Sequence, residues 1–132
     1  MISKGYQKDI EPQVASLPIS AETAHILSEM LANSLELESS DALVEGYRLA
    51  GKTGTAEIPT ATGYTSDLSN ASFVGWGPVD DPRFLVYIWL EKPRISVWAS
   101  EVAAPVFREA VERLVVLLDL PPDDLRQELL GQ

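Results

Sequence analysis

Apolar residues return every three or four positions in two segments of the chain, and this spacing predicts two helices. In residues 21–35, leucine and methionine side chains form one apolar stripe, so we expect a helix that buries one face. Ser20 stands directly before this segment and can accept hydrogen bonds from the free N–H groups of the first helical turn. A second stripe runs from Phe107 to Leu118 and predicts a long C-terminal helix over about residues 103–120.

Three further segments are rich in β-branched and aromatic residues and predict strands over residues 47–58, 71–77 and 84–91. A short connection containing aspartate and proline separates the last two, which suits an antiparallel turn. The third strand is apolar without alternation, so we expect other structure to cover both of its faces. Residues 59–70 are rich in Pro, Gly, Ser and Thr and predict a loop.

The order helix, strand, loop, two hairpin strands, helix predicts an α+β fold with an antiparallel sheet of about three strands. A length of 132 residues with 45% hydrophobic content suits one globular domain over residues 1–132. Within it, residues 1–18 predict no defined element and form a lead-in. After two prolines, residues 121–132 are expected to form a short helix and tail.

Composition and charge exclude several classes of function. A formal net charge of -10 argues against a nucleic-acid or anionic-membrane surface, because phosphates are bound by clustered Lys and Arg. The absence of cysteine excludes disulfides, thiolate zinc sites and cysteine nucleophiles, and the single histidine, His25, has no second imidazole for a metal site. No signal peptide and no run of about 18 apolar residues is present, so we expect this chain to be soluble and to need no metal or cofactor.

The segment GYRLAGKTGTAE, residues 46–57, fits two motifs that imply different chemistry. It contains the phosphate-binding pattern G-x-x-x-x-G-K-[ST], and its Lys52-Thr53-Gly54 is also the third signature of penicillin-interacting serine enzymes. A phosphate loop needs a strand before its first glycine and a helix after its lysine. Here Gly46 follows a polar turn, and the β-branched threonines after the lysine oppose a helix. We therefore reject nucleotide binding.

Placed along a strand that borders a cleft, the same residues have a coherent chemistry. Lys52 supplies positive charge, and the hydroxyls of Thr53 and Thr55 can hold a substrate carboxylate. Gly54 lets a substrate backbone approach closely, and the backbone N–H of Thr55 can face a developing oxyanion. We interpret Lys52 and the Thr55 N–H as candidate catalytic groups, and residues 53–55 as the candidate substrate-binding residues.

Several longer segments, in the same order, resemble the C-terminal half of the transpeptidase domain of penicillin-binding proteins. These segments are GYRLAGKTGTAE, then SFVGWGPVDDPRFLVYIWLEKP, then AAPVFREAVERL, and the upstream PISAETAHILSEML is similar to the helix before the K-T-G strand of that family. The resemblance covers most of the chain. It implies a partial penicillin-binding or β-lactamase-like transpeptidase fold, and it adds Trp76 and the 59–70 loop as possible neighbours of the cleft.

The resemblance also implies a function for the complete protein. Members of the family are membrane-anchored enzymes that face the cell wall, cross-link peptidoglycan stem peptides through a serine acyl-enzyme, and are acylated by β-lactams. In that reading the K-T-G strand of this chain binds substrate and contributes half of the oxyanion hole.

One departure from the family pattern limits the activity expected of this chain. The family nucleophile lies in S-x-x-K and a second serine in S-x-N, and neither motif occurs in this sequence. Without a nucleophile acyl transfer cannot begin, so we expect the chain alone to be inactive. Two readings stay open: part of a transpeptidase that needs the missing N-terminal half of the domain, or a small non-catalytic binding module. In the family, the strand that corresponds to residues 84–90 also pairs with a strand from the N-terminal part of the domain, so the resemblance predicts self-association through residues 84–90. The competing possibility is that residues 1–18 fold back and supply the missing strand.

Overall fold

The computed structural model describes residues 11, 13–37, 41–61 and 63–130, and it confirms the α+β class. Three helices and three strands follow one another as α1 (Ala21–Leu37), β1 (Ala50–Thr60), β2 (Gly63–Gly77), β3 (Phe84–Glu91), α2 (Ala99–Leu117) and α3 (Asp123–Leu130). Ser20 caps α1 as predicted, because its hydroxyl oxygen accepts a 3.1 Å hydrogen bond from the Thr23 N–H.

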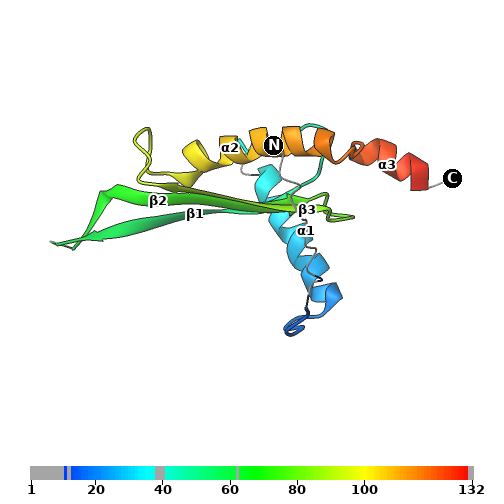
Figure 1. Cartoon of the computed structure of the whole chain (residues 1–132), viewed down its shortest axis with the longest axis horizontal. Helices are drawn as coiled ribbons and strands as arrows, with labels where there is room; N and C mark the ends of the chain where they lie inside the picture. The colour runs from blue at the N-terminus through cyan, green and yellow to red at the C-terminus, as the bar shows by residue number, and fades with distance from the viewer. Residues whose placement is uncertain (1–10, 12, 38–40, 62, 131–132) are drawn as a thin grey trace, which may run out of the picture.

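The strands form one antiparallel sheet in the order β1-β2-β3, with β2 in the centre. In the middle of the sheet Lys52 lies opposite Val74, and Val74 lies opposite Tyr87. Because β3 pairs only with residues 70–77 of β2, the β1–β2 hairpin extends beyond it, as Figure 1 shows.

The main core lies between the sheet and α2, which runs along one face in Figure 1. Phe73 of β2 and Phe107 of α2 are fully buried, and their ring centroids are 4.5 Å apart. Gly75 lets the two elements approach, since a Cβ at this position would lie 2.5 Å from the Phe107 ring. The long apolar helix predicted from the sequence therefore has its stripe directed at the sheet.

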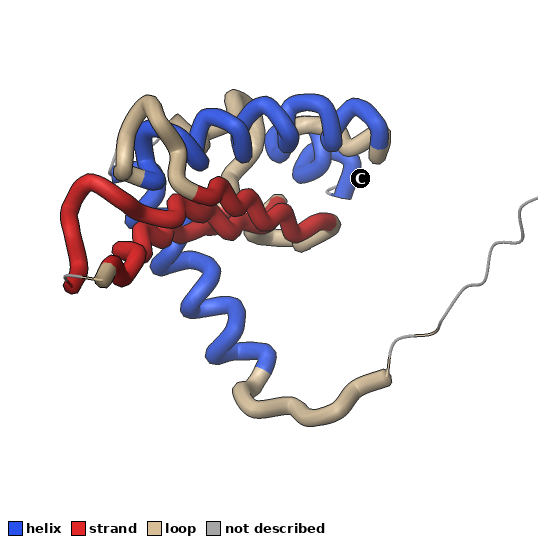
Figure 2. The backbone as a smooth tube through the Cα atoms, turned by 60° about the vertical axis from the view of Figure 1, so that its left-hand side comes forward, coloured by secondary structure: helices blue, strands red, loops and turns tan. Residues whose placement is uncertain are grey.

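The opposite face of the sheet is only partly covered. Helix α1 packs against β1 and projects away from the sheet, as Figure 2 shows. Leu85, Tyr87 and Trp89 of β3 are 66%, 60% and 53% exposed on this side. The expectation that β3 is covered on both faces is therefore wrong for this chain. An apolar run indicates that a strand is suited to burial. Burial of its second face requires a further element, and none of the described residues form one there.

Element boundaries also differ from the predictions. Residues 59–70 are not a loop, because Pro59 pairs with Tyr64 and Glu57 pairs with Ser69, which continues the hairpin to a short turn. Backbone pairing across the hairpin prevails there over the turn-forming composition. The first strand begins at Ala50, not 47, since Tyr47 instead forms an isolated bridge with Val44.

The boundaries of the helices also differ from the predictions. Helix α1 continues to Leu37, and α2 occupies Ala99–Leu117 and not 103–120, with Pro105 inside it. The helix starts four residues earlier than predicted, because the prediction places Pro105 in the first turn, where proline is most common, whereas Pro105 lies inside the helix. In the part of the chain that the structure describes, no helix is long and apolar enough to span a bilayer, and no cluster of candidate ligands suits a metal ion.

Candidate functional site

The K-T-G segment lies on the edge strand of the sheet. Among the residues that the structure describes, β1 has a partner strand on one side only, so every second residue directs its backbone N–H and C=O groups to a free edge. Alternation places Lys52 and Gly54 on the face that α1 partly covers, and the two threonines on the face of α2. The strand itself is confirmed for these residues, and the structure adds that it lies at the edge of the sheet.

Lys52 and Thr53 meet although their side chains leave opposite faces of the strand. The Lys52 ammonium donates to the Thr53 hydroxyl oxygen at a distance of 3.3 Å. Since β2 blocks the other side, two adjacent side chains can meet only around the free edge of β1. Lys52 is exposed, and within the described residues it forms no ion pair, so its charge is available at this edge.

Thr55 is tied to the start of α2. Its hydroxyl oxygen accepts a 3.2 Å hydrogen bond from the backbone N–H of Ala99, the first residue of the helix. Trp98, the N-cap residue of α2, makes no capping hydrogen bond with its own side chain. Thr55 thus satisfies one of the free N–H groups of the helix, a contact that the sequence did not indicate.

Gly54 is required where two neighbouring strands approach closely. A Cβ at this position would lie 2.6 Å from the hydroxyl oxygen of Ser72, which is its partner on β2. The Ser72 hydroxyl donates to the Gly54 carbonyl at 3.3 Å. A side chain at residue 54 would therefore displace this serine.

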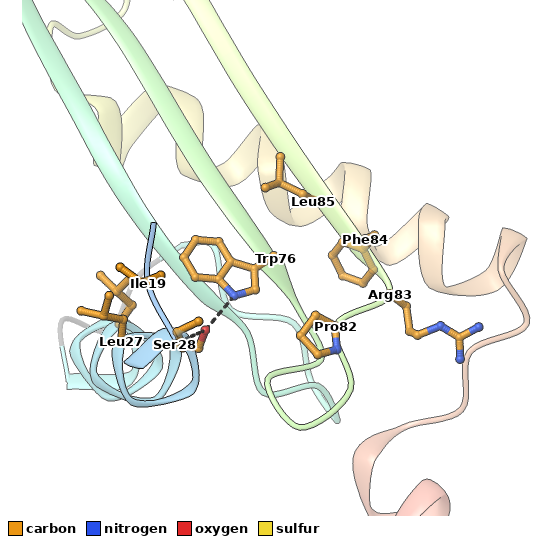
Figure 3. Close-up of a pocket in the computed structure, with 10 residues that line it drawn as sticks. Ile19, Leu27, Ser28, Trp76, Pro82, Arg83, Phe84 and Leu85 are labelled. Carbon is orange, nitrogen blue, oxygen red and sulfur yellow. Dashed lines mark hydrogen bonds between the residues drawn. The ribbon is translucent and has the colours of Figure 1, made fainter. Parts of the chain in front are cut away.

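Trp76 lies on the same face of the sheet as Lys52, opposite Ala50 in the register. Its indole N–H donates to the Ser28 hydroxyl at 3.2 Å, which joins β2 to α1 (Figure 3). Trp76 lines an apolar pocket of about 710 Å³ between α1 and the start of β3, and no residue of the K-T-G segment lines it. The remaining lining residues are Ile19, Ala24, Leu27, Ser28, Leu31, Pro82, Arg83, Phe84 and Leu85.

A polar cluster that sequence reasoning missed holds the chain just before β1. The Arg48 guanidinium bonds to three side chains of α1, with N–O distances of 2.6 Å to Glu29, 2.9 Å to Glu36 and 2.6 Å to Asn33. Its backbone N–H donates to the Asp123 carboxylate of α3 at 2.7 Å. Arg48 therefore attaches α1 and α3 to the segment directly before β1, through partners up to 75 positions away.

Arg126 completes the attachment of α3. It is 8% exposed and donates to the carboxylates of Asp80 and Asp123 at 2.6 and 2.9 Å. Burial alone raises the pKa of Asp80, but the hydrogen bond and the charge of Arg126 outweigh it and leave that pKa lowered. No local pattern in the sequence marks Asp80, Asp123 and Arg126 as partners, because the first lies 46 positions from the arginine.

The lowered pKa of Asp80 predicts a pH dependence of stability. Ionised Asp80 stabilises the fold above the pKa that it has in the unfolded chain, and this stabilisation is lost as the pH falls through the folded value, below about pH 4. In urea titrations at pH 6 and at a pH well below the unperturbed aspartate value of 3.8, such as about pH 2, we expect Asp80→Asn to lower the free energy of unfolding at pH 6 by on the order of 0.5 kcal/mol, because the carboxylate is partly exposed. At the lower pH the variant and the parent are expected to converge. A difference that grows on acidification would contradict this assignment.

Known proteins resemble this chain over most of its length. A family model described as the penicillin-binding protein transpeptidase domain matches residues 1–112. A probable peptidoglycan D,D-transpeptidase of Pseudomonas aeruginosa, PbpC, is 35% identical over 86 residues, which is 64% of this chain and 15% of that protein. The penicillin-binding protein PbpB of Mycolicibacterium smegmatis is 36% identical over 115 residues, covering 78% of this chain and 18% of that protein.

Solved structures of other proteins also resemble the fold of this chain. The transpeptidase domain of penicillin-binding protein 3 from Burkholderia pseudomallei superposes with a TM-score of 0.76 at 31% identity, over 89% of this chain and 37% of that one. Penicillin-binding protein 3 of Mycobacterium tuberculosis, in complex with ampicillin, superposes with a TM-score of 0.66 at 28% identity, over 79% of this chain and 26% of that one. The chain therefore spans a minor part of each of these relatives.

Proposed function

Because the chain belongs to the family of penicillin-binding protein transpeptidase domains, of which it forms a part, we propose that it supplies the substrate-binding strand of a peptidoglycan D,D-transpeptidase. One observation carries the proposal: the ammonium of Lys52 and the hydroxyl of Thr53 meet around the free edge of β1. A ligand that lies along this edge meets a positive charge, two threonine hydroxyls and free backbone groups of one strand. We assign Lys52 and the Thr55 N–H to catalysis, and residues 53–55 to substrate binding.

The ligand that this edge suits is an extended peptide that ends in a carboxylate, such as a peptidoglycan stem peptide. Backbone groups of the edge pair with a peptide backbone, while the ammonium and the hydroxyls meet the terminal carboxylate. A β-lactam carries a comparable carboxylate, and we propose it as a second ligand class of the complete domain. Trp76 is a neighbour of the cleft only through the shared face of the sheet, since its direct contact is with α1.

The edge is expected to bind weakly when the chain is alone, because the opposite wall of the cleft is missing. Titration of the isotopically labelled chain with N-acetyl-D-Ala-D-Ala, followed by NMR, is expected to give a dissociation constant in the millimolar range, on the order of 4 kcal/mol of binding free energy. Lys52→Ala should weaken it further. The matched control is Lys92→Ala, which removes an exposed lysine after the end of β3. Equal weakening by both substitutions, or submillimolar binding lost with Lys52, would contradict this picture.

Acyl transfer requires a nucleophile that the sequence does not contain, so the chain alone is proposed to be inactive. The residues of the edge can position a substrate and stabilise charge, but none of them has the serine and lysine arrangement that attacks a carbonyl. The serine motifs are expected in the N-terminal part of the same domain. For the complete protein we propose a membrane anchor, with the transpeptidase domain outside the cytoplasmic membrane.

This absence predicts that no penicillin becomes attached to the chain. After incubation with ampicillin, intact-mass spectrometry is expected to show the unmodified mass alone. Penicillin-binding protein 3 of M. tuberculosis, which was solved as a complex with ampicillin, is the positive control. A stoichiometric acyl adduct on any serine of this chain would overturn the proposal of inactivity.

We further propose that the open edge of β3 and its apolar face are the surface on which the remainder of the domain packs in the complete protein. The three exposed apolar side chains of β3 and the adjoining 710 Å³ pocket form one apolar region. Exposure of such a region to water is unfavourable, which is typical of a surface that binds another part of a protein. When the chain is alone, we propose that a second copy takes this place. The alternative of a non-catalytic binding module uses the same surface and keeps the strand without the chemistry.

A further inference from the structure

We propose that the first residue of α2 is a positioning group for the candidate substrate strand: the Ala99 N–H donates to the Thr55 hydroxyl oxygen and thereby directs the hydroxyl proton toward a bound carboxylate. The inference rests on the proposed function of the strand. It adds a group that lies 44 positions away from Thr55 and outside the K-T-G segment. Ala99 does not itself touch the ligand in this arrangement.

The first step concerns the hydrogen-bonding capacity of the Thr55 hydroxyl. A hydroxyl group carries one proton and two lone pairs. The Ala99 N–H occupies one lone pair at 3.2 Å, and the proton of the hydroxyl has no acceptor within the described residues. Since an N–H group cannot accept a hydrogen bond, the proton must point away from Ala99. Thr55 is exposed, so this proton is available to a ligand.

Thr53, two positions earlier on the same face of β1, shows the same arrangement. Its hydroxyl oxygen accepts from the Lys52 ammonium at 3.3 Å, and its proton likewise has no acceptor in the described part of the chain. The strand thus offers two hydroxyl protons beside one positive charge. A carboxylate accepts on both oxygens, whereas a terminal amide has one acceptor and an NH₂ group that would oppose a donor. The pair therefore selects a carboxylate over an amide.

The second step concerns rigidity. Thr55 replaces the missing side-chain cap of α2, so the helix start and the threonine hold each other in place. Helix α2 is in turn anchored by Phe107 and Val111, which are fully buried in the core. A donor on a rigid helix fixes the direction of the hydroxyl before the ligand arrives, which favours binding because less freedom is lost on association. The N–H of the helix start is consumed by Thr55 and is not a ligand site.

The test measures how strongly the chain prefers N-acetyl-D-Ala-D-Ala to its C-terminal amide, by NMR titration of the full chain. We expect the wild type to prefer the carboxylate by about tenfold, in line with one or two hydrogen bonds to a charged group. Ala99→Pro removes the N–H, and proline is accepted at the first position of a helix. The ψ angle of 125° at Trp98 also suits a residue that precedes proline. In this variant the preference should fall to about twofold while binding of the amide stays unchanged.

A double-mutant cycle separates positioning from a general effect on folding. Thr55→Val keeps the shape of the side chain without its hydroxyl, and it should lower the carboxylate preference as far as Ala99→Pro does. The two substitutions combined should lower it no further. Thr55→Ser, which keeps the hydroxyl, should retain most of the preference.

Direct observation of the Ala99 amide proton keeps the proposal testable if the proline variant fails to fold. In the wild type its chemical shift is expected to move on addition of the carboxylate ligand and to stay constant with the amide. In Thr55→Val it should respond to neither. A constant Ala99 shift with the carboxylate would overturn the inference.

The remaining outcomes are distinct. If Lys52→Ala and Thr55→Val abolish the preference but Ala99→Pro does not, the positioning role is wrong and the proposed function stands. If Ala99→Pro weakens both ligands equally, its role is structural and the inference falls. If the wild type binds neither ligand at tens of millimolar, the inference and the proposed function both fall.

Discussion

Phe107→Ala is expected to lower the free energy of unfolding by about 3–5 kcal/mol, as measured by urea denaturation. Phe107 is fully buried in α2, and its ring lies 4.5 Å from that of Phe73, centroid to centroid. Truncation removes this contact and leaves a cavity that the sheet cannot close, since the backbone of Gly75 offers no side chain to fill it. Small domains are stable by only about 5–15 kcal/mol, so much of the chain population is expected to unfold at moderate urea concentration.

The matched control is Val116→Ala on the same helix. Val116 is 77% exposed, so its truncation removes little apolar contact and should change the free energy of unfolding by less than about 0.5 kcal/mol. Equal effects of the two substitutions would show that α2 does not pack on the sheet through Phe107. Because the Thr55 hydroxyl is held by the start of the same helix, Phe107→Ala should also weaken carboxylate binding in any population that stays folded.

Light scattering is expected to show a dimer, with twice the 14.4 kDa mass of the chain, at tens of micromolar concentration. Within the described ranges the second edge of β3 has no partner strand, and no proline or charge between residues 84 and 90 opposes the pairing of two such edges. A two-fold axis at Tyr87 would place Tyr87 opposite its copy and Leu85 opposite Trp89 of the copy. Cross-strand pairs of aromatic and aliphatic side chains of this kind stabilise a sheet.

Tyr87→Lys tests this interface because Tyr87 is 60% exposed at the centre of β3. Two lysines opposite each other should repel and shift the protein to a monomer, while the fold is retained. Ile88→Lys, which sequence alone would suggest equally, is less suitable because Ile88 packs against the α2 core. Tyr64→Lys, at an exposed site on the distal hairpin, is the control. A monomer at high micromolar concentration that Tyr87→Lys leaves unchanged would refute the dimer.

The dimer and the remainder of a transpeptidase domain compete for one surface in these proposals. In the B. pseudomallei structure this chain matches 37% of that chain, so most of that domain has no counterpart in this sequence. A chain that is monomeric only when the remainder of the domain is supplied would support both proposals. The candidate substrate strand β1 and β3 lie at opposite edges of the sheet, so a partner bound at the β3 edge leaves Lys52 accessible.

Much of the architecture could be predicted because it depends on local patterns. The three-to-four spacing of apolar residues marked α1 and α2, since a helix brings such residues to one face whatever the rest of the chain does. Ser20 was identified as a cap for the same reason, because its partner is three residues away. The K-T-G strand is predictable because β-branched residues oppose a helix locally, whereas its position at the edge of the sheet is a finding of the structure.

Other features depend on residues that are distant in sequence, and only the tertiary structure decided them. The apolar run of β3 indicated burial, but which of its faces is covered depends on where α1 and α2 pack, and that left Leu85, Tyr87 and Trp89 exposed. The sequence predicts a ligand-binding role for the Thr55 hydroxyl, but the hydrogen bond of this hydroxyl with Ala99 spans 44 positions and has no local signal. The contact of Arg48 with Asp123 spans 75 positions, and no local sequence pattern indicates it either. The periodicity of the sequence indicates which side chains are suited to burial or to polar contact. The packing of the chain decides which residues become their partners, because hydrogen bonds and apolar contacts act only between groups that the fold brings within a few ångströms.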